Sequence, residues 1–170
     1  MSIKTIIKFK QICDHLSIDL KIQEDFEKRL IIQKVFYFLN KMGLELNTKF
    51  NFYKYGPYSP DLTDIYYSLA EIPEETYQTL PEIELKEEEL EILQRVKNLY
   101  VNWGKDLKKF EFLASVLYIY KDMYIKNKDN EKIKNVIMKL KPDLFTKYNF
   151  EEILEELRKE GFIEEYIKQY

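Results

Sequence analysis

The residues from about Gln23 to Met42 are apolar on almost every side of the α-helix that they predict. Large apolar side chains recur at steps of three and four positions: Phe26, Leu30, Ile31, Val35, Phe38, Leu39 and Met42. Ile32, Phe36 and Tyr37 extend this stripe nearly all round the helix. A helix that is apolar on most sides normally lies inside a domain, so this segment predicts the central helix of a bundle.

An aromatic segment follows, in which aromatic and polar side chains interleave. Residues 48–55 therefore predict a β-strand. A single strand cannot pair its own backbone groups, so it needs a partner. The two candidate partners are residues 44–46, just before it, and residues 162–166 near the end of the chain.

The next turn, YGPYSPDL, contains residues with clear structural roles. Gly56 can adopt backbone angles that are closed to other residues, and Pro57 fixes its own φ. Ser59 suits the N-cap of a helix, Pro60 its first position, and the charge of Asp61 its first turn. These roles explain Ser59 without catalysis, and no histidine lies near it in sequence.

The same periodicity predicts further helices at residues 3–16, 60–70, 86–101, 107–120, 133–140 and 150–160. Residues 72–85 predict a surface connection with room for one helical turn. The predicted fold class is mainly α: a compact helical bundle with a small β-hairpin. We expect one domain over residues 1–170, with a helical core at 23–70 and a packed C-terminal helical half at 86–166. The outline of residues 112–166 is that of a winged helix.

The central helix, the aromatic strand and the turn together resemble the YwgA-type proteins, which are similar in turn to the SocA-like, or Panacea, antitoxin domains. The residues that carry the resemblance are Leu30, Gln33, Lys34, Tyr37, Phe38, Leu39, Gly56, Pro57, Tyr58, Ser59, Pro60, Leu62 and Tyr67. It extends over about residues 29–163. The resemblance implies a mostly helical, non-enzymatic domain that holds a partner protein, as an antitoxin or an adaptor does.

The net charge of −3 conceals blocks of opposite sign. Residues 1–60 carry +4, 61–100 carry −8, 101–141 carry +5 and 142–170 carry −4. We expect these blocks to neutralise one another within the fold, although they could also face a partner. A nucleic-acid-binding protein is more often basic overall. The heavy use of Lys, Glu and Ile is common in thermophile proteins, and also in AT-rich genomes.

The sequence predicts no metal, no cofactor and no catalytic residue. Cys13 is the only cysteine and His15 the only histidine, and residues two apart do not share a helix face. The glutamates at residues 82–91 are typical of a solvated helix start, although they could bind a cation or a basic partner: Glu82, Glu84, Glu87, Glu88, Glu89 and Glu91. The chain start alternates Lys with apolar residues, unlike a signal peptide, and no run approaches the length of a membrane span. We therefore expect a cytoplasmic protein without membrane contact.

Two surfaces are candidates for binding. Tyrosines cluster around the turn and have two interpretations, core packing or a partner-binding surface: Tyr53, Tyr55, Tyr58, Tyr66 and Tyr67. The alternative is a winged-helix DNA-binding regulator that contacts phosphates through lysines: Lys126, Lys128, Lys132, Lys134, Lys139 and Lys141. Its recognition helix would be residues 150–160, which are acidic and would repel DNA. We therefore favour a protein partner.

Overall fold

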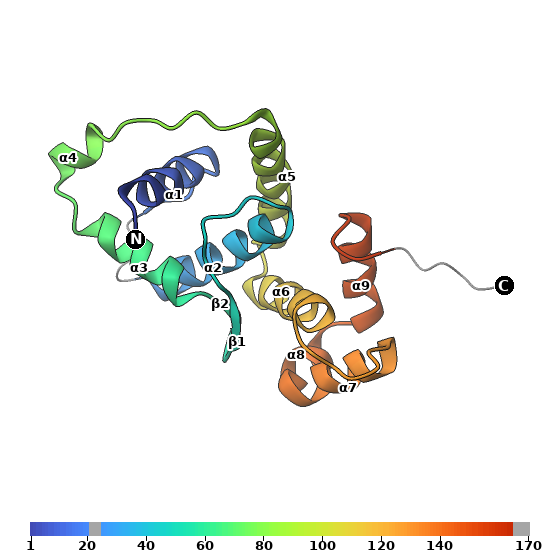
Figure 1. Cartoon of the computed structure of the whole chain (residues 1–170). Helices are drawn as coiled ribbons and strands as arrows, with labels where there is room; N and C mark the ends of the chain where they lie inside the picture. The colour runs from blue at the N-terminus through green and yellow to red at the C-terminus, as the bar shows by residue number, and fades with distance from the viewer. Residues whose placement is uncertain (21–24, 165–170) are drawn as a thin grey trace.

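The computed structural model describes residues 1–20 and 25–164, which form nine helices and one two-stranded sheet (Figure 1). The elements are α1 (Ile3–His15), α2 (Phe26–Lys41), β1 (Asn51–Tyr53), β2 (Gly56–Tyr58), α3 (Pro60–Ala70), α4 (Glu74–Gln78), α5 (Glu87–Trp103), α6 (Leu107–Lys121), α7 (Asn130–Leu140), α8 (Pro142–Lys147) and α9 (Phe150–Lys159). The prediction of a mainly helical fold with a small hairpin is confirmed. The predicted start of the central helix at Gln23 lies outside the described residues.

Side chains at the helix starts explain where several helices begin. The Asp25 carboxylate accepts a hydrogen bond from the Lys28 backbone N–H at 3.1 Å and caps α2. Ser59 caps α3, as the sequence predicts, and Asn149 caps α9 in the same way. Gly43, with φ +101°, follows the end of α2 in a left-handed conformation.

Helices α2 and α6 form the centre of the core. Every residue from 32 to 39 in α2 and from 110 to 117 in α6 is buried. Phe38 of α2 packs against Trp103, Phe110 and Phe162, with ring centroids 5.3, 5.5 and 5.1 Å away. One hydrophobic cluster therefore joins α1 and α2 to the residues that follow α9.

The strand pairing differs from the prediction. Strand β1 pairs antiparallel with β2, which follows after the two residues of the turn, and not with residues 44–46 or with the described residues 162–164. Residues 165 and 166 lie outside the described part of the chain. The register pairs Phe52 with Pro57, between the pairs Asn51–Tyr58 and Tyr53–Gly56. Pro57 fits because its missing N–H belongs to a pair that does not exchange hydrogen bonds with β1. Residues 56–58 of the turn motif thus form strand β2.

The C-terminal half, at residues 107–164, consists of the helices α6 to α9 and the loops that connect them. Lys141 ends α7, and Pro142 directly after it takes the first position of α8. Gly161, with φ +79°, follows the end of α9, and Phe162 and Ile163 pack into the core. No strand occurs among these residues, and the wing that the sequence predicts at residues 162–166 extends beyond the described part of the chain.

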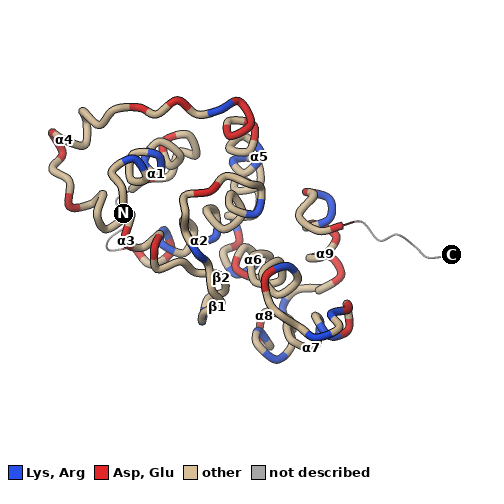
Figure 2. The backbone as a smooth tube through the Cα atoms, viewed as in Figure 1, with Lys and Arg blue, Asp and Glu red and all other residues tan. Residues whose placement is uncertain are grey.

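Charged residues of both signs are spread over the helices and loops (Figure 2), and members of opposite blocks pair across the fold. Lys8 pairs with Glu89 at 2.6 Å, and Lys109 pairs with Glu156 at 2.7 Å. Such part-exposed pairs each contribute about 0–1 kcal/mol, so they balance charge more than they stabilise. Within the described residues, no helix combines the length and apolar character that crossing a membrane requires.

Candidate binding site

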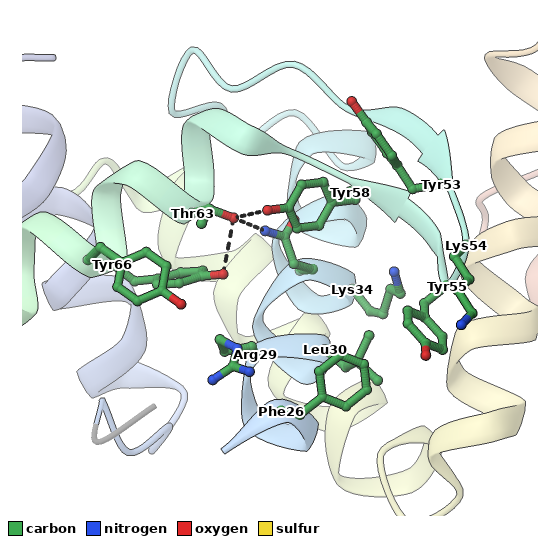
Figure 3. Close-up of a pocket in the computed structure, with 12 residues that line it drawn as sticks. Phe26, Arg29, Leu30, Lys34, Tyr53, Lys54, Tyr55, Tyr58, Thr63 and Tyr66 are labelled. Carbon is green, nitrogen blue, oxygen red and sulfur yellow. Dashed lines mark hydrogen bonds between the residues drawn. The ribbon is translucent and has the colours of Figure 1, made fainter. Parts of the chain in front are cut away.

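A pocket of about 370 Å³ lies between α2, α3 and the hairpin, meaning β1, β2 and the turn Lys54–Tyr55 (Figure 3). Helix α2 supplies its central wall, and the hairpin and α3 flank it on opposite sides. Most of the residues that line it are aromatic or cationic. The lining consists of Phe26, Arg29, Leu30, Gln33, Lys34, Tyr53, Lys54, Tyr55, Tyr58, Thr63, Tyr66 and Tyr67. A volume of this size suits a small molecule or the end of a peptide.

Gln33 joins α2 to the start of α3. Its amide oxygen accepts from the Ser59 N–H at 2.8 Å, and its amide nitrogen donates to the Ser59 carbonyl at 3.1 Å. The same nitrogen donates to the Thr63 hydroxyl at 3.1 Å. That hydroxyl also bonds to the hydroxyls of Tyr58, at 2.6 Å, and Tyr66, at 3.1 Å. Two of the five tyrosines are therefore fixed by a shared network (Figure 3).

Two buried lysines hold the hairpin by its carbonyl groups. Lys34 of α2 donates to the Pro57 carbonyl at 2.7 Å. Lys141 donates to the Lys54 carbonyl and to the Glu111 carboxylate, the latter at 3.0 Å. Burial lowers the pKa of Lys34 to about 7, with Lys141 acting in the same direction and Glu111 opposing it. Lys34 is thus a buried amine that gains or loses its proton near neutral pH.

The lowered pKa of Lys34 predicts a pH-dependent stability. The unfolded lysine keeps its proton up to about pH 10.5, whereas the folded one loses it near pH 7. The unfolded chain therefore binds more protons between these values, and the free energy of unfolding rises with pH. From pH 7 to 8.5 we expect the wild type to gain up to about 1.4 kcal/mol per pH unit relative to Lys34→Met.

Urea denaturation at several pH values measures this slope. The control is Lys105→Met, at an exposed lysine remote from the pocket in sequence, which should keep the wild-type slope. The upper limit of pH 8.5 avoids Cys13, because burial raises the pKa of that thiol and gives the opposite trend above pH 9. Equal slopes for the wild type and Lys34→Met would contradict the assignment.

The rim of the pocket exposes large aromatic side chains. Phe26, Tyr53 and Tyr67 are 48%, 47% and 41% exposed. Tyr55 packs edge-on against Phe26, with ring centroids 5.1 Å apart, and Lys54 lies over the Tyr55 ring. Tyr53 packs against Tyr58 and Tyr67 packs against Tyr66, so each exposed ring contacts another ring of the lining.

The charged residues among the described lining are all cationic. They are Arg29, Lys34 and Lys54, and none of the described lining residues is a carboxylic acid. Arg29 lies over the ring of Phe26, with its guanidinium carbon 5.9 Å from the ring centroid. Cations beside aromatic faces favour an anionic ligand that also has an apolar or planar part.

The structure brings together all five tyrosines that the sequence singles out, since each of them lines this pocket. Gly56, Pro57, Ser59, Pro60 and Asp61 have the expected local roles, and the Asp61 carboxylate also accepts from the Lys49 N–H at 3.0 Å. The contacts of Gln33 and Lys34 are not among those that the sequence predicts. The available signal was their polarity inside an apolar helix, because buried polar groups require partners.

The six candidate DNA-binding lysines differ in their burial and in their hydrogen bonds. Lys141 is buried, because it bonds to Glu111 and to the hairpin, so its assignment to a surface patch is wrong. Lys128 donates to the Tyr120 carbonyl, and Lys132 donates to two carbonyls of its own loop. Lys126 and Lys139 are exposed and Lys134 is half-buried.

Cys13 is buried in the core and His15 is exposed. Among the described residues, no three His, Cys, Asp or Glu side chains gather in a way that could hold a metal ion.

Comparison of the chain with protein-family models, with curated proteins and with solved structures finds no match.

Proposed function

We propose that this chain is a non-enzymatic protein-binding module of the YwgA/Panacea type, antitoxin- or adaptor-like, and that the aromatic pocket contacts its partner. The observation that carries the proposal is the gathering of five tyrosines around one pocket, with Phe26, Tyr53 and Tyr67 exposed at its rim. Exposed aromatic clusters are typical of protein interfaces.

The fixed positions of these rings support the proposal. Tyr58 and Tyr66 are held through Thr63, and Tyr53 packs edge-on against Tyr58 with centroids 5.2 Å apart. A tyrosine that is already ordered loses little side-chain entropy on binding and offers a large contact area. Aromatic residues of this kind often contribute about 2 kcal/mol or more each to association.

Substitution of the rim tyrosines tests the proposal. The tagged full-length protein is expressed in its native cells, and the captured protein is identified, purified and titrated against the variants. We expect Tyr53→Ala and Tyr67→Ala each to weaken binding at least about tenfold, because each removes an aromatic contact at the interface. Circular dichroism of each variant confirms that it is folded.

Tyr124→Ala is the matched control, because Tyr124 is 87% exposed and does not line the pocket. It should bind the partner as the wild type does. Absence of any captured partner, or equal weakening by Tyr124→Ala, would count against the proposal. The DNA-binding alternative stays a prediction.

A further inference from the structure

We infer that Lys34 is a covalent binding site, at which the side-chain amine condenses with a small aromatic aldehyde that enters the pocket. This role goes beyond the proposed function and needs no protein partner. Three features of the site support it: the place of the amine beside the cavity, its burial, and the rings that surround it.

The amine of Lys34 is buried and yet borders a cavity. Lys34 is only 2% exposed, and it lines the pocket of about 370 Å³ between α2, α3 and the hairpin. In Figure 3 its side chain lies between Tyr55 and Tyr58, above Leu30 of the same helix. Its Nζ donates to the Pro57 carbonyl at 2.7 Å, which fixes the amine beside the hairpin. A ligand in the pocket therefore meets an ordered amine that bulk water hardly reaches.

The surroundings of Lys34 favour the neutral form of its amine. Burial lowers the pKa of Lys34 to about 7, with Lys141 acting in the same direction and Glu111 opposing it. About half of the folded molecules therefore carry the neutral amine at pH 7, whereas an exposed lysine is neutral in about one molecule in three thousand. Only the neutral amine attacks a carbonyl carbon, so a lysine that is desolvated in an apolar pocket is an activated nucleophile.

The reaction forms one bond to carbon and releases one water molecule. The neutral Lys34 amine attacks the aldehyde carbon, and a carbon–nitrogen bond forms. The aldehyde oxygen leaves as water together with both hydrogens of the amine, and a carbon–nitrogen double bond, the imine, remains. A proton from solvent then restores an N–H on the imine nitrogen, which can donate to the Pro57 carbonyl again. The condensation changes no oxidation state, and water reverses it.

Aromatic rings bound the space next to the amine. Tyr55 packs edge-on against Phe26, with ring centroids 5.1 Å apart, and the Tyr58 hydroxyl bonds to Thr63 at 2.6 Å. A planar aromatic aldehyde can pack against these rings while its carbonyl carbon lies at Lys34. The pocket volume suits a small ligand of this kind. We therefore expect aromatic aldehydes to react in preference to small aliphatic ones.

Reductive trapping on the intact protein tests this assignment. Benzaldehyde and sodium cyanoborohydride are added at pH 7.5, where the reductant converts an imine into a stable secondary amine, and peptide mass spectrometry locates the benzyl group. Lys54 is the internal control, because it lines the same pocket but is exposed. We expect Lys34 to be labelled at least about tenfold faster than Lys54 or the exposed Lys105. With acetaldehyde, this preference should fall at least about threefold.

Two leucine substitutions show whether the aldehyde arrives through the pocket. Leu30→Trp would fill space beside Lys34 and leave the Lys34–Pro57 hydrogen bond in place, so it should slow labelling of Lys34 at least about fivefold. Leu90→Trp is the matched control, because Leu90 is 42% exposed on α5 and does not line the pocket. It should label as the wild type does. Circular dichroism of both variants confirms that they are folded.

Unfolding provides a further control that needs no substitution. In urea at a concentration that unfolds the protein, Lys34 should lose its advantage over Lys105, because the burial that lowers its pKa is gone.

Labelling of Lys34 no faster than Lys54 in the folded protein would overturn the assignment. Equal labelling of Lys34 in Leu30→Trp and in the wild type would do so as well, because the aldehyde would then reach Lys34 by another route than the pocket. An equal preference for Lys34 with acetaldehyde and with benzaldehyde would refute the aromatic class of the ligand.

Discussion

Glu111→Gln is expected to lower the free energy of unfolding by about 3–5 kcal/mol, the usual cost of removing one partner from a buried ion pair. The Glu111 and Lys141 side chains are 8% and 9% exposed, and their charged atoms are 3.0 Å apart. Glutamine keeps the size of the side chain and removes its charge. Lys141 would then remain a buried cation without a counter-charge, and the pKa of Lys34 would fall further, because Glu111 raises it.

Urea denaturation measures this loss, and Asp14→Asn provides the control. Asp14 pairs with Lys10 at 2.8 Å on α1, but its side chain is 54% exposed. Such a pair contributes about 0.3–0.5 kcal/mol, so its loss should be barely detectable. A loss of less than 1 kcal/mol for Glu111→Gln would show that water screens the Glu111–Lys141 pair.

Gly56→Ala is expected to destabilise the protein by about 2–5 kcal/mol, through two separable causes. Gly56 has φ +86°, a conformation that alanine adopts at a cost of about 1–2 kcal/mol. A Cβ at this position would also overlap the Ser115 hydroxyl of α6. Overpacking of this kind costs about 1–3 kcal/mol.

Gly43→Ala isolates the backbone cost. Gly43 has φ +101°, and a Cβ there would meet no atom within 4 Å. Gly43→Ala should therefore lower the free energy of unfolding by about half as much as Gly56→Ala does. The overlap is tested in a Ser115→Ala background, because the Ser115 hydroxyl is buried without a hydrogen-bond partner among the described residues. Gly56→Ala should cost less in that background, and an unchanged cost would show that the overlap is relieved elsewhere.

The sequence predicts the helices and the cap residues because these depend on neighbouring positions. The periodicity of α2 identifies it as central, and Ser59 marks the start of α3. The pairing of β1 could not be found in this way, because Pro57 argues against a strand unless its missing N–H is known to face away from β1.

The polar contacts of the site depend on residues that are distant in sequence. Gln33 and Lys34 are visibly polar within an apolar helix, but nothing local indicates that their partners are Ser59 and Pro57. Lys141 lies in a lysine-rich segment, where composition favours the surface. Lys141 can be buried because it bonds to Glu111 of α6. The two residues are 30 positions apart and lie side by side only in the folded chain.

The side chains of Gln33 and Lys34 have a consequence for how the sheet can grow. A two-stranded hairpin normally presents two open edges, and each is a template for another strand. Along β2 and its extension, Lys34 occupies the Pro57 carbonyl, Pro57 has no N–H, and Gln33 occupies both backbone groups of Ser59. These two side chains of α2 therefore occupy the backbone groups of β2 and its extension that a third strand would otherwise bind. They close one edge to β-augmentation and to aggregation, so any added strand would have to approach along β1.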